Sequence, residues 1–204
     1  MVKLAKDFYN RPTLDVAKDL LGKELVHHVG GENLVSRIVE VEAYIGEIDK
    51  ACHAYNNKVT NRTKVLYAPP GTAYVYLIYG MYYCFNAVTE EEGKAAAVLV
   101  RGVEPLEGIE KMVNNRYKKG IEEISKKQMI NLSNGPGKLC IAMSITKANN
   151  EMDLCGNHLY IKEAEENFSF DIVETTRINI GYAEEAIAFP WRYYIKDNLY
   201  VSKK

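Results

Sequence analysis

The feature that most constrains the fold of this chain is a long run of β-branched and apolar residues at 34–44, preceded by a Gly-Gly-Glu-Asn turn at 30–33 and a shorter β-rich run at 24–29. Two β-rich runs joined by a glycine-containing turn are typical of an antiparallel hairpin. The runs at 72–78 and 82–88 predict a second hairpin, because Gly80 in the three-residue loop between them supplies the positive φ that such loops need.

Helices are predicted beside these hairpins. Thr13 predicts the N-cap of a short helix over 14–21, which ends before Gly22. Pro105 predicts the start of another helix, which continues to about Arg116, because proline is favoured in the first helical turn.

The rest of the chain adds short elements. The basic stretch 118–127 is predicted as a surface loop or helix, and the Gly-rich turn at 134–138 leads into a helix whose N-terminus could bind an anion. Further strands are expected at 95–103, 159–161, 172–180 and 192–201. We therefore predict the α+β class, with one domain over 1–204 that has a curved, mostly antiparallel sheet, a protruding β-hairpin and surrounding helices.

Composition excludes several classes of protein. With 204 residues, 47% of them hydrophobic and 26% charged, the chain is long enough to bury a core and is not disordered. The longest apolar and aromatic run, 74–85, is shorter than the roughly 20 residues that a membrane span needs. Because the N-terminal residues also lack an apolar leader, we expect no membrane association and a cytoplasmic location, close to the nucleoid if the source is bacterial.

Cysteine and histidine spacing argues against a metal site. The chain has four cysteines and no CxxC pair, so we interpret them as reduced thiols in or near the core rather than as disulfides or zinc ligands. The four histidines form none of the usual zinc motifs. We expect neither a metal nor another cofactor. The cysteines are Cys52, Cys84, Cys140 and Cys155.

Charge is segregated along the chain although the net charge is only −1. Residues 50–89 contain four basic side chains and no acidic one, whereas 111–147 contain eight basic and two acidic ones. This pattern fits either a dipolar, solvated surface or a face that binds nucleic acid.

Two carboxylates share one face of the strand expected at 34–44. The two-residue period places Glu40, Glu42 and Tyr44 on the same face, with neighbouring positions about 7 Å apart. If this face is partly desolvated, repulsion between the carboxylates raises one pKa, as a general acid or base requires. The alternative is a solvated face of a sheet, on which pairs of glutamates are common.

Tyrosines are concentrated in the second hairpin. The chain has 15 Tyr against 5 Phe and 1 Trp, and six of these tyrosines fall within 67–83. Tyr74 and Tyr76 share one face as a stacking platform, while Tyr79 and Met81 flank Gly80 at the tip, a position suited to a wedge. An aromatic-rich core is the alternative, but the hairpin lies inside the acid-free stretch.

A tyrosine pocket, a carboxylate, a wedge and basic flanks together suit a protein that extrudes a base from a duplex and acts on its glycosidic bond. Five sequence blocks also resemble the alkyladenine (3-methyladenine) DNA glycosylase family, in the same order and at the same spacing. The similarity extends over about 8–201. The blocks are 8–25, 37–53, 69–88, 98–108 and 134–145.

The resemblance implies catalytic and base-binding roles. Glu42 matches the general base that activates a water to attack C1′ of the damaged nucleotide, and Arg101 resembles an arginine that helps to hold this water and the nucleotide's phosphate. Glu40 either supports the site from behind or is solvated. The residues expected to bind the flipped base are Tyr44, His53 and Tyr76, which sandwich it, and Asn86, which helps to exclude the exocyclic amine of guanine.

The resemblance also implies how duplex DNA with damaged purines is bound. Tyr79 is expected to insert into the duplex with Met81 beside it in the groove, and Arg62, Lys64 and Lys138 are expected to contact backbone phosphates. The implied substrates are 3-methyladenine, 7-methylguanine, hypoxanthine and ethenoadenine. No lysine of the carboxylate strand is placed as a nucleophile, so we expect a monofunctional enzyme, acting as a monomer.

The chain departs from the family pattern at several positions, of which Asn179 bears on the range of lesions. Thr63 and Asn179 stand where the family usually has Asn and Gly, Leu66-Tyr67 replaces Met-Phe, and Ile141 replaces Gln.

Two rival functions share these sequence features. The first is a damage-sensing module that stacks bases without cleaving them, which the presence of Glu42 beside Tyr44 disfavours. The second is a hydrolase that uses Glu40 and Glu42 on a small glycoside, which is disfavoured because both carboxylates lie on one strand and cannot flank a bond.

Overall fold

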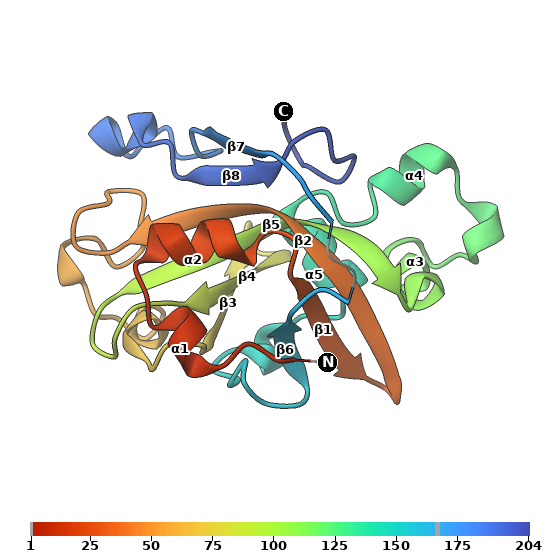
Figure 1. Ribbon diagram of the computed structural model, residues 1–204, viewed down its shortest axis with the longest axis horizontal. Helices are drawn as coiled ribbons and strands as arrows, with labels where there is room; N and C mark the ends of the chain where they lie inside the picture. Colours follow the sequence, from red (N-terminus) through yellow and green to blue (C-terminus); the bar gives the residue numbers. More distant parts are fainter. Residues whose placement is uncertain (1, 166–167) are drawn as a thin grey trace.

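An eight-stranded sheet organises the computed structural model, which describes residues 2–165 and 168–204 (Figure 1). Its strands follow the order β3-β4-β5-β2-β1-β6, and β8 joins β2 and pairs with β7. All strand pairs are antiparallel, as the sequence predicted. The strands are β1 (Glu24–Val29), β2 (Glu32–Ile45), β3 (Ala73–Ile78), β4 (Tyr82–Val88), β5 (Ala96–Glu107), β6 (Leu159–Lys162), β7 (Ile172–Thr175) and β8 (Arg192–Ile195).

Helices cover both faces of this sheet. In Figure 1, α2 lies in front of β2 and β5, and α5 lies behind the sheet, packed against β4 and β5. The α-helices are α1 (Lys6–Tyr9), α2 (Thr13–Leu20), α3 (Ile109–Tyr117), α4 (Lys126–Ile130) and α5 (Pro136–Ala142). The 3-10 helices are η1 (Tyr55–Asn57), η2 (Lys64–Tyr67), η3 (Ile121–Glu123), η4 (Lys147–Asn149) and η5 (Glu184–Ala188). This arrangement confirms the predicted α+β class.

Strand β2 is the junction of the sheet. It pairs with β5 along most of its length, with β1 near its start and with β8 at residues 40–42. The register between β2 and β5 shifts on both sides of Glu40, an irregularity that increases local twist. Glu40 and Glu42 are both completely buried. The alternative of a solvated face is therefore wrong.

The second hairpin forms as predicted. Strands β3 and β4 pair from Ala73 opposite Ala87 to Ile78 opposite Tyr82. The φ angle is 54° at Tyr79 and 69° at Gly80, so the tip contains two left-handed residues. Left-handed backbone is routine for glycine but rare for a bulky side chain.

Two predicted helix starts were wrong, whereas the helix expected after the Gly-rich turn does begin there, at Pro136. The N-cap of α2 is Pro12, and Thr13 is the first helical residue, with its hydroxyl donating to Glu90 at 2.6 Å. Pro105 lies in β5, beside a register shift opposite Ser36, where the missing N–H of proline is tolerated. The helix that Pro105 was expected to start begins at Ile109 instead.

The late strands are shorter than predicted. Strand β7 ends at Thr175 rather than near 180, and β8 ends at Ile195 rather than near 201. Left-handed residues follow both ends, with φ of 61° at Asn179 and at Asp197, and such residues interrupt extended backbone. The segment 176–182 is therefore free to leave the sheet and line a pocket.

The cysteines are in or near the core, as predicted. Cys52, Cys84 and Cys140 are buried free thiols, and Cys155 is half-buried. Among the described residues, no helix has both the length and the apolar character needed to cross a membrane.

Candidate active site

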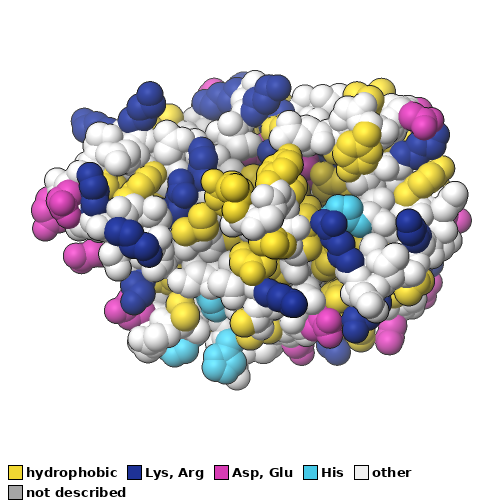
Figure 2. All heavy atoms as spheres, turned by 180° about the vertical axis from the view of Figure 1, so that it is seen from behind, with side chains coloured by type: hydrophobic (Ala, Val, Ile, Leu, Met, Phe, Trp, Pro, Cys, Tyr) yellow, Lys and Arg dark blue, Asp and Glu magenta, His cyan; other side chains and the backbone are white. Residues whose placement is uncertain are grey.

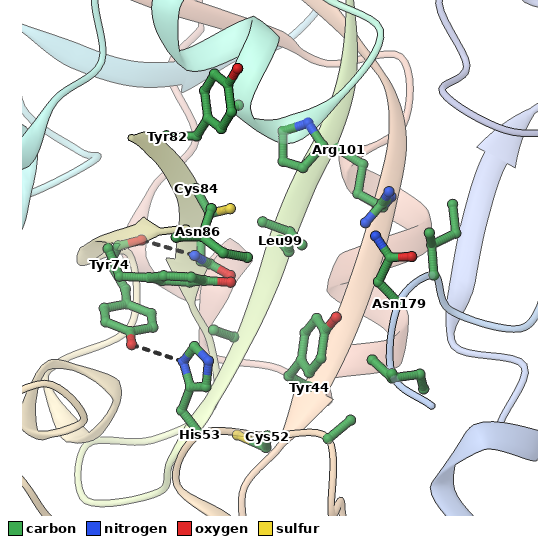
Figure 3. A pocket seen from close by; sticks show the side chains of 18 of the residues that line it. Tyr44, Cys52, His53, Tyr74, Tyr82, Cys84, Asn86, Leu99, Arg101 and Asn179 are labelled. Atoms are coloured by element: carbon green, nitrogen blue, oxygen red, sulfur yellow. Dashed lines mark hydrogen bonds between the residues drawn. The ribbon is translucent and has the colours of Figure 1, made fainter. Parts of the chain in front are cut away.

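A pocket of about 380 Å³ lies between the second hairpin, strand β5, the start of α5 and the segment after β7 (Figure 3). In Figure 3, Tyr74 and Asn86 lie on one side of the pocket and Arg101 and Asn179 on the other. Aromatic and polar side chains therefore approach the cavity from elements far apart in the sequence. The lining includes Tyr44, Cys52, His53, Tyr74, Tyr76, Tyr79, Tyr82, Cys84, Asn86, Leu99, Arg101, Ile178, Asn179, Ile180 and Tyr182.

Glu42 lies directly behind this lining. Its Oε2 accepts hydrogen bonds from the Tyr44 hydroxyl at 2.7 Å and from Arg101 Nη1 at 3.3 Å. Its Oε1 accepts a bond from the backbone N–H of Ile178 at 2.7 Å. All three donors belong to residues that line the pocket, so the carboxylate has a fixed orientation at the wall of the cavity.

Arg101 links the two buried carboxylates of β2. Its Nε donates to Glu40 at 3.4 Å while its Nη1 donates to Glu42. Burial alone would lower the pKa of the Arg101 guanidinium, but Glu42 and Glu40 raise it. Arg192 completes the cluster by donating to Glu40 at 2.9 Å, and the backbone N–H of Ser202 donates to the other oxygen of Glu40 at 2.7 Å. Glu40 therefore supports the site from behind.

A second buried ion pair fixes the segment after β7. The guanidinium of Arg177 donates to both oxygens of Asp49, at 2.5 and 2.7 Å, and both side chains are fully buried. It also lies 4.8 Å from the ring centroid of Tyr44. Because Ile178 is the next residue, this ion pair holds the N–H that binds Glu42.

The aromatic wall is built by His53, Tyr74 and Tyr76. The Tyr74 and Tyr76 rings are 5.1 Å apart and tilted by 36°, and His53 meets Tyr76 edge to face at 4.7 Å. His53 Nδ1 is 3.1 Å from the Tyr74 hydroxyl. Burial, followed by the charge of Arg62, lowers the pKa of His53 to about 4, so the imidazole is neutral at neutral pH.

Tyr44 and Asn86 have fixed polar partners. Burial, followed by the neighbouring Glu42, raises the pKa of the Tyr44 hydroxyl well above its usual range, so it remains a donor to this carboxylate. Asn86 is buried, and its Nδ2 donates to the backbone oxygen of Tyr74 at 3.0 Å.

The hairpin tip is highly exposed. Tyr79 and Met81 are 70% and 65% exposed, and Tyr79 also lines the pocket rim. Figure 2, viewed from the side on which α5 lies, shows hydrophobic side chains gathered at the centre of a face, with Lys and Arg around them and most Asp and Glu toward the edges. A hydrophobic patch surrounded by basic side chains suits the binding of a polyanion.

The predicted phosphate-binding residues lie at different places. Arg62 and Lys64 are exposed beside η2, whereas Lys138 is half-buried, and its Nζ donates to Asn131 at 2.9 Å and to Asn134 at 2.7 Å. Burial, followed by the charge of Arg116, lowers the pKa of Lys138. None of the three is among the residues that line the pocket.

The Gly-rich turn before α5 has a packing role. A Cβ added at Gly137 would lie 2.9 Å from the Cβ of Tyr82, so the glycine lets the tip end of the hairpin pack closely on the helix. The turn therefore sets where the hairpin stands relative to the sheet.

The structure brings most of the predicted site together. Tyr44, His53, Tyr76, Asn86 and Arg101 line one pocket, with Tyr79 at its rim and Glu42 behind its wall. The sequence interpretation missed the wall formed by Ile178, Ile180 and Tyr182, because it placed 172–180 in a strand. A signal was present in Asn179, since asparagine tolerates the left-handed backbone at a position where the family commonly has glycine.

The fold and the pocket define an α+β protein with a cavity whose aromatic wall lies close to a buried, hydrogen-bonded carboxylate. The family model described as methylpurine-DNA glycosylase matches residues 7–199, and the chain belongs to this family of DNA glycosylases, which hydrolyse N-glycosyl bonds. The predicted family and enzyme class are thus confirmed.

Curated relatives agree along the whole chain. A protein of Alkaliphilus oremlandii is 65% identical over 203 residues, and proteins of Clostridium tetani and Clostridium perfringens (strain SM101) are 58% and 56% identical over 203 and 207 residues. In each comparison the match covers 100% of both chains, and all three relatives are provisionally named 3-methyladenine DNA glycosylases. The non-catalytic module considered from the sequence is therefore disfavoured.

Proposed function

We propose that this glycosylase flips alkylated or deaminated purines out of duplex DNA and hydrolyses the N-glycosidic bond with a water activated by Glu42. The observation that carries the proposal is the buried Glu42 carboxylate, which is hydrogen-bonded to two pocket residues, Tyr44 and Arg101. The proposed substrates are 3-methyladenine, 7-methylguanine, hypoxanthine and ethenoadenine. The products are an abasic site and the free base; a cationic base leaves as a neutral molecule, whereas hypoxanthine and ethenoadenine are protonated as they leave.

Glu42 has two proposed tasks. It takes a proton from the attacking water, and its negative charge stabilises the oxocarbenium character that develops on the sugar. Arg101 helps to hold the water and the phosphate of the flipped nucleotide. Tyr44 and the neighbouring N–H of Ile178 keep the carboxylate from rotating, so its position is already set before the nucleotide arrives.

The aromatic side chains hold the flipped base. Tyr44, His53 and Tyr76 are proposed to sandwich it, which favours electron-poor and cationic bases over undamaged purines. Asn86, held by its bond to the Tyr74 backbone, limits the room for the exocyclic amine of guanine. Undamaged purines are also rejected because they are costlier to unstack from a sound base pair.

At the rim of the pocket, Tyr79 is proposed to fill the space left in the duplex, with Met81 beside it in the groove. Their exposure supports this role, since both side chains are available to a partner. Arg62, Lys64 and Lys138 are proposed to contact phosphates. The proposed functional unit is a monomer of one domain, so we expect a particle of 23.1 kDa in sedimentation.

The decisive test is an excision assay. The protein is incubated in excess with duplex oligonucleotides that carry one of the four lesions, and the abasic product is cleaved with alkali. We expect strand cleavage with at least one lesion and no adduct when borohydride is added. If none of the four lesions is excised, the proposed function is contradicted. A trapped covalent adduct would contradict the monofunctional mechanism.

A further inference from the structure

Arg62 makes two contacts with the aromatic wall of the pocket. Its guanidinium carbon lies 4.7 Å from the ring centroid of Tyr76, and its Nη2 is 3.3 Å from Nε2 of His53. Because an arginine nitrogen can only donate, Nε2 of His53 must accept, and the remaining imidazole proton is on Nδ1, facing the Tyr74 hydroxyl. Arg62 therefore fixes the tautomer of His53.

The turn that carries Arg62 is internally braced. Thr63 is buried, and its hydroxyl donates to the backbone oxygen of Lys58 at 2.7 Å while it accepts from the N–H of Thr60 at 2.8 Å. The guanidinium thus begins from a fixed backbone position, although the side chain itself is exposed. A residue that served only as a phosphate contact would not need to lie against the aromatic wall.

We propose that Arg62 sets the charge preference of the pocket, because its guanidinium disfavours a positively charged damaged base relative to a neutral one. This inference rests on the proposed function. The Arg62 guanidinium already interacts with the π electrons of Tyr76. A cationic base stacked on the same ring therefore gains less cation–π energy. The guanidinium also adds like-charge repulsion across the wall. A neutral lesion such as hypoxanthine is affected by neither contribution.

The low pKa of His53 is consistent with this arrangement. Burial is the main cause, and the charge of Arg62 adds to it. The aromatic wall therefore has the cation of Arg62 against it and a neutral imidazole within it.

The test compares one cationic and one neutral lesion. Single-turnover excision rates at saturating enzyme are measured for 7-methylguanine and hypoxanthine in the same duplex sequence. We expect Arg62→Gln to raise the ratio of the 7-methylguanine rate to the hypoxanthine rate about threefold, the size of an exposed cation–π interaction. Arg62→Lys keeps the charge and should stay closer to the wild-type ratio.

Lys64→Gln is the matched control, because Lys64 is an exposed cation two residues away. It should weaken DNA binding and leave the ratio of the two rates unchanged. The wild type gives a measurement that is independent of substitutions, since added salt should screen Arg62 and raise the same ratio.

The outcomes separate the two proposals. An unchanged ratio in Arg62→Gln, with weaker DNA binding and a smaller salt dependence of that binding, would show that Arg62 is a phosphate contact only. If the wild type excises none of the four proposed lesions, the proposed function itself is contradicted.

Discussion

The buried charge cluster of β2 and the tip of the β3–β4 hairpin face the same pocket but are built in opposite ways. Glu40 and Glu42 are completely buried and hydrogen-bonded to arginines, whereas Tyr79 is 70% exposed in a left-handed conformation. The cluster is satisfied within the protein alone. The tip has a strained backbone and an exposed apolar surface. Both features are typical of sites that bind a partner.

This difference teaches that the two regions should respond differently to substitution. Changes in the cluster should affect catalysis or folding, because its charges are compensated only by one another. Changes at the tip should affect DNA binding with little effect on folding, because the tip makes few contacts that stabilise the isolated protein.

The largest expected effect is on catalysis. Glu42→Gln keeps the size of the side chain and an oxygen that accepts from Tyr44, but it cannot take a proton from water. We expect the single-turnover excision rate to fall about 10³-fold, within the range for loss of a general base. Binding to duplex DNA with an abasic-site mimic, measured by fluorescence anisotropy, should be retained. Full excision activity in this variant would remove Glu42 from its proposed role.

The next largest effect is on stability. Arg177→Met removes both bonds to the fully buried Asp49, and leaving such a carboxylate unpaired should lower the free energy of unfolding by about 3–5 kcal/mol. Urea denaturation measures this loss. Lys18→Met is the control, because its ion pair with Glu174 is exposed and should contribute less than about 1 kcal/mol. Equal losses in the two variants would mean that burial does not distinguish these pairs.

A substitution at the hairpin tip should weaken DNA binding and leave the free energy of unfolding nearly unchanged. Tyr79→Ser removes the aromatic ring proposed to enter the duplex, and we expect a loss of about 1–3 kcal/mol in the binding free energy for lesion-containing DNA. The free energy of unfolding should change by less than about 0.5 kcal/mol. Tyr79→Phe should keep the affinity. Unchanged binding by Tyr79→Ser would mean that the exposed tip does not enter the duplex.

The smallest effect concerns the segment that joins the cluster to the pocket. Asn179 has a φ of 61°, so Asn179→Ala should cost about 1 kcal/mol of unfolding free energy, because alanine is disfavoured in left-handed backbone. Asn179→Gly should stay within about 0.5 kcal/mol of the wild type. Equal stabilities of the Ala and Gly variants in urea would show that this conformation is not maintained.

Much of the fold could be predicted from local patterns. The hairpin formed by β3 and β4 was predicted closely, because its two β-rich runs and the glycine-containing loop between them are adjacent in sequence. The strand conformation of Pro105 could not be predicted, because the proline is tolerated in β5 only through the register shift opposite Ser36. That shift depends on a strand about 70 residues away.

The candidate site likewise contains residues that local patterns predict and residues that depend on distant contacts. Its aromatic residues and Glu42 followed from strand periodicity and from the family resemblance, whereas the burial of Glu40 was left open. It depends on Arg192, which is 152 positions away. The wall at Ile178 and Tyr182 was missed, because Arg177 leaves the strand to meet Asp49, 128 positions earlier. Contacts over such separations leave no mark on local composition.

The branching of the sheet at β2 has a consequence for how the protein folds. Glu42 meets Arg101 across 59 positions, and Glu40 meets Arg192 across 152, so neither carboxylate has its compensating charge until distant parts of the chain have docked. Closing such long loops is slow, and contacts of this kind form late. We therefore expect the hairpins to form before the charge cluster, which is complete only when β8 has docked onto β2.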